Sequence, residues 1–155
     1  VLARGGLVAD RRTYWDVAAL QVGWLAASAV EPMLLPRPFV TPLAATMVAA
    51  LLAGQALRYW AVAALGDRWS LRIVVVPGEP AVTSGPYRFL RHPNYLAVLV
   101  EYAALPLVHA AWLTAAVCTL LGALVLARRI RLEEAALAAH GGDRRAAIGT
   151  PGVAP

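Results

Sequence analysis

Lysine is absent from this chain of 155 residues, and cysteine occurs once, as Cys118. A single cysteine excludes an internal disulfide framework and a cysteine-rich metal site. Arginine therefore supplies all of the positive side-chain charge when histidine is neutral, and the formal net charge is +5. The arginines gather at the ends of apolar runs and form no face on a polar body, a distribution that indicates membrane topology rather than nucleic-acid binding.

Apolar residues are what the chain has in excess: they make up 60% of it, against about 45–50% in a soluble domain. We expect an all-α integral membrane bundle, because a span needs roughly 20 apolar residues. About four transmembrane helices are predicted, at residues 17–35, 40–65, 95–108 and 110–130. The first lacks the pattern of a removable signal peptide. The third is short, which predicts tilt or an extension, and residues 109–111 form the turn of a tight helical hairpin.

The arginines also predict orientation. They are frequent before the first span, between the second and third, and after the fourth, whereas the opposite loops hold Arg37 alone. Positive residues favour the cytoplasmic side, so both termini and the long link at residues 66–94 are predicted to be cytoplasmic. Residues 1–140 are predicted to form a single domain, and residues 141–155 a disordered tail.

The link ends in an unusually polar stretch, GPYRFLRHPNY, at residues 85–95. Such a segment cannot lie in lipid, because its backbone polar groups would be unsatisfied. It is either a surface loop whose arginines contact lipid phosphates or part of a binding site. A second polar cluster, in which Arg129 and Glu133 share a helix face, follows the fourth span on the same membrane side. Joined by one short hairpin, the two clusters can meet, and such a site suits a charged cofactor and a lipophilic substrate.

Three segments together carry a family resemblance: LGDRWS (65–70), VTSGPYRFLRHPNY (82–95) and RIRLEEAAL (129–137). They resemble the isoprenylcysteine carboxyl methyltransferase family, which is related to the phospholipid methyltransferases, and in particular its short bacterial members. The resemblance implies a methyltransferase of the bacterial cytoplasmic membrane that uses S-adenosyl-L-methionine. The implied partners are a lipophilic small-molecule substrate and membrane lipids, with no nucleic acid and no metal.

The resemblance also implies roles for individual residues. Arg129 faces the acceptor as a catalytic and substrate-binding residue, and Trp69 is a second acceptor contact. The implied cofactor-binding residues are Ala81, Val82, Tyr87, His92, Pro93, Asn94, Tyr95 and Glu133. The family usually has aromatic residues after the paired glutamates, and here that region has none. This departure favours O-methylation of an alkyl-phenol or polyketide lipid over methylation of an isoprenoid-cysteine carboxylate, and both stay open.

Glu101 is an ionisable residue at membrane depth, which is a functional hypothesis by default. It is a candidate catalytic base for a phenol, whose unperturbed pKa is near 10. The alternative is a carboxyl group hydrogen-bonded to a neighbouring helix. Other function classes are a phospholipid N-methyltransferase and a non-catalytic membrane protein or transporter subunit, although no internal repeat supports a transporter. The sequence does not determine the oligomeric state. Trp24 lies inside the first span, where its side chain could equally serve helix packing.

Overall fold

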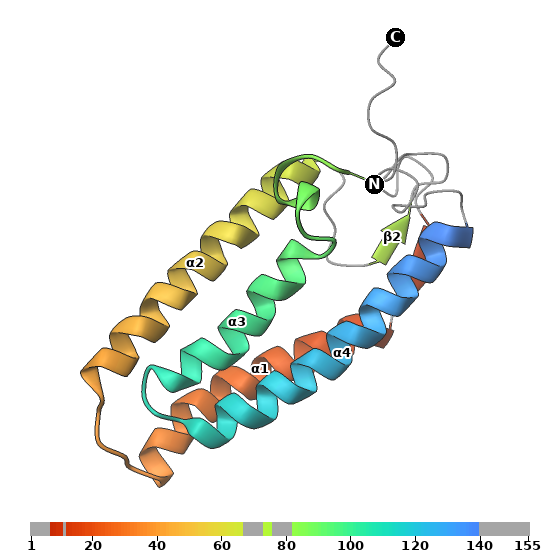
Figure 1. Ribbon diagram of the computed structural model, residues 1–155. Coiled ribbons are helices and arrows are strands. Elements are labelled where there is room, and N and C mark those ends of the chain that lie inside the picture. The colour runs from red at the N-terminus through yellow and green to blue at the C-terminus, as the bar shows by residue number, and fades with distance from the viewer. Residues whose placement is uncertain (1–6, 11, 67–72, 76–81, 140–155) are drawn as a thin grey trace.

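The computed structural model describes residues 7–10, 12–66, 73–75 and 82–139, and most of them are helical (Figure 1). The helices are α1 (Arg12–Leu34), α2 (Thr41–Leu65), α3 (Pro93–Leu107) and α4 (Trp112–Ala139), with a short 3-10 helix, η3, at Gly85–Arg88. The predicted helical bundle with a hairpin between the last two helices is confirmed.

Proline and glycine set the helix boundaries. Pro93 is the first residue of α3 and Pro42 the second residue of α2; in the first turn a missing amide hydrogen costs nothing and φ is already helical. Gly66 ends α2 with φ of 51°, a conformation that residues with a side chain rarely adopt. The helix ends therefore follow from local chemistry.

Three helices are long and apolar enough to cross a membrane, by length and composition: Trp15–Leu34, Thr41–Leu65 and Trp112–Ala135. The third expected span corresponds to α3, whose 15 residues are fewer than the roughly 20 that a full crossing needs. It packs against both α2 and α4, while α1 packs on α4 (Figure 1). The shortness of this helix was predicted; its crossing of the membrane stays a prediction.

Small residues let the helices approach closely. Ala97, Ala104, Ala111 and Ala115 are buried between helices, as is usual where association depends on packing rather than on exclusion of water. Large apolar side chains such as Leu120 face outward and are exposed. Small residues between the helices and an apolar outer surface are typical of a protein embedded in the bilayer. The chain is therefore an integral membrane protein.

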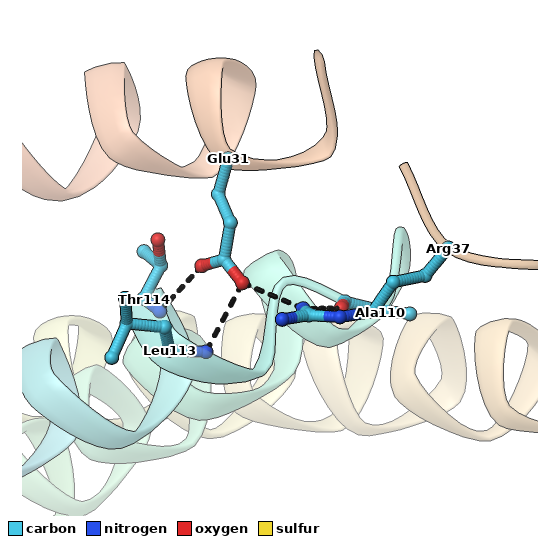
Figure 2. A network of polar contacts seen from close by, with 5 residues as sticks. All are labelled: Glu31, Arg37, Ala110, Leu113 and Thr114. Atoms are coloured by element: carbon cyan, nitrogen blue, oxygen red, sulfur yellow. Dashed lines mark hydrogen bonds and ion pairs between the residues drawn. The ribbon is translucent and has the colours of Figure 1, made fainter. Parts of the chain in front are cut away.

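One end of the bundle is fixed by a polar network (Figure 2). Glu31 of α1 accepts hydrogen bonds from the backbone N–H of Leu113 at 3.2 Å and of Thr114 at 2.6 Å. Its side chain is also paired with Arg37 Nη1 at 2.7 Å, and the same nitrogen donates to the Ala110 carbonyl at 2.7 Å. Glu31 therefore caps α4, satisfying orphan amides of its first turn.

Two short strands are an addition to the predicted all-helical architecture. β1 (Leu7–Asp10) pairs antiparallel with β2 (Ile73–Val75). This pairing joins the segment before α1 to the link between α2 and α3, so both lie at the same end of the bundle. The arginine distribution predicted the same arrangement.

Candidate functional site

The polar motif begins with a glycine that the structure requires. Gly85 opens η3 with φ of 59°, and a Cβ atom there would lie 2.9 Å from the Ala64 Cβ and 3.2 Å from Trp60 Nε1. The next residues, Pro86 and Tyr87, are buried. Gly85 thus lets η3 dock against the end of α2 and brings Tyr87 into the protein.

His92 and Tyr95 are fixed at the start of α3. The His92 carbonyl accepts hydrogen bonds from the backbone N–H of Tyr95 at 3.1 Å and of Leu96 at 3.2 Å. The His92 and Tyr95 rings stack, with centroids 5.3 Å apart and planes 8° from parallel. Pro93 between them is buried, so this end of the motif is held by backbone and side chain together.

The second polar cluster meets this motif across the α3–α4 interface. Arg129 Nε donates to the Tyr95 hydroxyl oxygen at 3.0 Å, and the Tyr95 hydroxyl donates to Glu133 Oε2 at 3.0 Å. Arg129 is buried. The helical spacing of Arg129 and Glu133 places both on the face that meets α3.

His92 stands between two carboxylates. Its Nδ1 lies 3.8 Å from Glu133 Oε2, and its Nε2 lies 3.7 Å from Glu134 Oε1. These separations are too long for direct hydrogen bonds but allow charge attraction when the imidazole is protonated. The site therefore combines a guanidinium, an imidazole, a phenol and two carboxylates at the end of an apolar bundle.

The other predicted cofactor residues are placed less fully. Val82 and Asn94 are half-buried, and the Asn94 side chain makes no hydrogen bond within residues 82–139. Ala81 and Trp69 lie outside the described residues, as does the predicted disordered tail at 141–155.

Glu101 belongs to a different cluster, between α3 and α2. It is buried, and both carboxylate oxygens are engaged: Gln55 Nε2 donates to Oε1 at 3.0 Å, and Arg58 Nη2 pairs with Oε2. The alternative expectation of a carboxyl group bonded to a neighbouring helix thus describes its contacts, while its role as a base stays a prediction. Arg58 and Gln55 are polar residues that the sequence interpretation missed. The sequence did contain a signal for this cluster: Arg58 lies within the second predicted span, and an arginine at membrane depth indicates a functional site as readily as a glutamate does.

Comparison with known families decides the classification. The model of the isoprenylcysteine carboxyl methyltransferase (ICMT) family matches residues 45–139, more than half of the chain. The chain belongs to the ICMT family. The matched region contains both polar clusters, and the recognised resemblance is therefore confirmed.

A bacterial relative shares much of this region. The "Uncharacterized protein YpbQ" of Bacillus subtilis (strain 168) is 41% identical over 91 residues, which cover 59% of this chain and 54% of the relative. The chain thus spans about half the length of that protein. No solved structure matches the chain.

ICMT-family methyltransferases generally use S-adenosyl-L-methionine, a molecule with a cationic sulfonium, an ammonium and a carboxylate. The donor set of this site fits such a zwitterion. Glu133 and Glu134 suit its positive groups, and His92, when protonated, suits its carboxylate. Among the residues described, no group of histidine, cysteine, aspartate and glutamate could hold a metal ion.

Proposed function

We propose that this ICMT-family protein is an S-adenosyl-L-methionine-dependent methyltransferase that methylates an oxygen of a lipophilic acceptor in the membrane. The acceptor is an alkyl-phenol or polyketide lipid, or an isoprenoid-cysteine carboxylate. When bound, the cofactor supplies a methyl group on a sulfonium sulfur. Catalysis by the chain would consist mostly of positioning and exclusion of water.

One observation supports the proposal above the others: the hydrogen-bonded series of Arg129, Tyr95 and Glu133. It joins two motifs that are far apart in sequence into one polar group at the end of an apolar bundle. A solvated helix end would not require a buried arginine bonded to a half-buried phenol. The arrangement suits a charged cofactor that must meet a substrate dissolved in lipid.

The proposed roles follow this geometry. Arg129 orients the acceptor, and Glu101 is a proposed base that a phenol would need and a carboxylate would not. Trp69 is a proposed acceptor contact. Proposed cofactor contacts are Ala81, Val82, Tyr87, His92, Pro93, Asn94, Tyr95 and Glu133.

Cofactor binding is tested by calorimetry with S-adenosylhomocysteine on the detergent-purified protein. We expect His92→Ala or Glu133→Ala to weaken binding about tenfold or more, which corresponds to about 1.4 kcal/mol. Arg131→Ala is the matched control, because Arg131 lies on the same helix and is exposed. Wild-type affinity in both His92 and Glu133 variants would place the cofactor elsewhere.

The acceptor class is tested with two lipids, an alkylresorcinol and an S-farnesylated cysteine. With the phenolic lipid, we expect Glu101→Gln to lower turnover strongly and Arg129→Ala mainly to raise KM. With the carboxylate, which is already ionised, Arg129→Ala should be the severe change and Glu101→Gln mild. A fully active Glu101→Gln enzyme on the phenolic lipid would remove Glu101 as a base.

A further inference from the structure

Arg58 is a half-buried cation whose hydrogen-bonding capacity is only partly used. Its Nη2 pairs with Glu101, which Gln55 also contacts. The Arg58 Nε atom is buried and has no hydrogen-bond partner in the described part of the chain. Buried polar N–H groups are nearly always satisfied, so this one calls for an acceptor that the described part of the chain does not supply.

The position of Arg58 suits a ligand that comes from the lipid. At about 1.5 Å per residue, Arg58 lies roughly 10 Å before the end of α2 at Leu65. Its side chain is still 33% exposed, on a bundle whose outer surface is apolar. A polar lipid head can therefore reach the guanidinium from the membrane side while its hydrocarbon tail stays in lipid.

Arg58 also lies next to the proposed cofactor site. Trp60 and Ala64, which follow it on α2, are the residues against which Gly85 of η3 packs. Across the interface, Glu101 is seven residues after Asn94 on α3, so the two lie on the same helix face about two turns apart. The Arg58–Glu101 pair therefore lies about two helical turns from the cofactor motif.

We propose that Arg58, held in place by Glu101 and Gln55, binds the oxygen of the methyl acceptor and selects oxygen acids over amines. This inference rests on the proposed function and deepens it. The ligand class is a lipid with a phenol, enol or carboxylate oxygen, which accepts a hydrogen bond from the Arg58 guanidinium. A lipid amine is cationic at neutral pH, has no comparable acceptor and is repelled by the guanidinium, so it is disfavoured by both effects.

Acceptor binding is the decisive measurement, made by calorimetry in lipid nanodiscs without cofactor. The probes are pentadecylresorcinol, S-farnesylcysteine with a blocked amine, and hexadecylamine. We expect wild-type protein to bind at least one oxygen acid and to bind the amine about tenfold or more weakly. Binding of none of the probes, or equal binding of the amine, would overturn the proposal.

Two variants separate recognition from folding. Arg58→Lys keeps a positive charge beside Glu101 but loses the rigid fork of N–H groups, and we expect it to weaken oxygen-acid binding about tenfold or more. The double variant Arg58→Leu/Glu101→Leu removes both partners, so it leaves no buried charge unpaired. We expect it to unfold near the wild-type temperature and to lose binding of the oxygen acid.

Arg128→Lys is the matched control, because Arg128 is exposed and its contact with Asp16 is long, at 3.5 Å; it should bind the probes as wild type does. Wild-type acceptor binding in both Arg58 variants would show that the pair is structural only. S-adenosylhomocysteine binding is measured on the same samples. If S-adenosylhomocysteine binds normally and acceptor affinity is the same in the wild type and the Arg58 variants, this inference alone fails. If the wild type neither binds S-adenosylhomocysteine nor transfers methyl groups, the proposed function fails.

Discussion

At the scale of single residues, the contact between Gly122 and Tyr102 shows how little space separates α3 from α4. A Cβ atom at position 122 would lie 2.4 Å from Tyr102 Cδ2 and 2.5 Å from Cε2. Tyr102 itself is almost fully buried and cannot swing away. Glycine is therefore needed here for close approach, and the position of Tyr102 depends on it.

Gly122→Ala should destabilise the protein by about 1–3 kcal/mol, because an added methyl group overpacks the interface. Gly23→Ala is the control, since a Cβ at that helical position would meet, among the described residues, no atom within 4 Å beyond its own stretch of helix. There alanine should be neutral or stabilising, by up to about 1 kcal/mol from helix propensity. Thermal unfolding in detergent, followed by circular dichroism, measures both; equal midpoints for the two variants would contradict the packing argument.

The residues of the candidate site divide into those that the sequence revealed and those that it did not. His92, Tyr95, Arg129 and Glu133 could be brought together in advance, because arginine topology and helical spacing place them on one side. The pairing of Arg58 with Glu101 spans 43 residues and depends on how α2 is rotated about its axis. Hydropathy does not set that rotation when a helix is apolar on all sides.

At the scale of elements, α3 contains a proline whose missing amide donor is replaced by a side-chain donor from another helix. Pro106 lies inside α3 and has no amide hydrogen, so it cannot donate the usual helical bond to the Tyr102 carbonyl. Trp24 Nε1 of α1 donates to that carbonyl at 3.2 Å. The two rings also meet edge to face, with centroids 5.1 Å apart. An indole thus replaces a backbone donor and ties α1 to α3.

A double-mutant cycle tests this substitution of donors. Trp24→Phe keeps an aromatic ring but leaves the Tyr102 carbonyl without its indole donor, and should cost about 1–3 kcal/mol. In a Pro106→Ala background the helix regains its own donor, so the same change should cost less. Denaturant unfolding in mixed micelles gives the coupling free energy. Additive effects of the two changes would mean that the indole acts through packing alone.

The elements themselves were largely predictable, because Pro42, Gly66 and Pro93 mark boundaries by local rules. The ribbon of β1 and β2 was not. Ile73–Val75 is rich in β-branched residues and is typical of a strand, whereas Leu7–Asp10 is too short and mixed to identify without its partner. Strand pairing between distant segments is decided by tertiary structure, which a local pattern does not contain.

At the scale of the whole molecule, the four α-helices set the relation between the two ends of the described chain. The described ends agree with alternation: β1 precedes α1 and pairs with the link after α2, and the end of α4 carries Glu133 beside the start of α3. We propose that this shared end faces the cytoplasm, because it carries most of the arginines.

Cysteine labelling measures that orientation. In a Cys118→Ala background, Gly5→Cys and Gly152→Cys should both react only when the inner side of intact cells or inverted vesicles is exposed to a membrane-impermeant maleimide. A cysteine introduced at Phe39, in the opposite loop, is the control and should label from outside. Labelling of the two terminal positions from opposite sides would mean an odd number of crossings, and α3 would then be the helix that does not span.

The cap that Glu31 provides has a consequence for how the protein is made. Its amide partners Leu113 and Thr114 lie 82 and 83 residues further along the chain, so they have not been synthesised when α1 leaves the ribosome. A lone carboxylate in an apolar segment opposes insertion into the bilayer. Arg37, six residues away, emerges almost with it and provides a counter-ion from the start. The nascent α1 can therefore enter the bilayer with the charge of Glu31 neutralised by Arg37. The first turn of α4 then donates its backbone N–H groups to the same carboxylate once α4 has been synthesised.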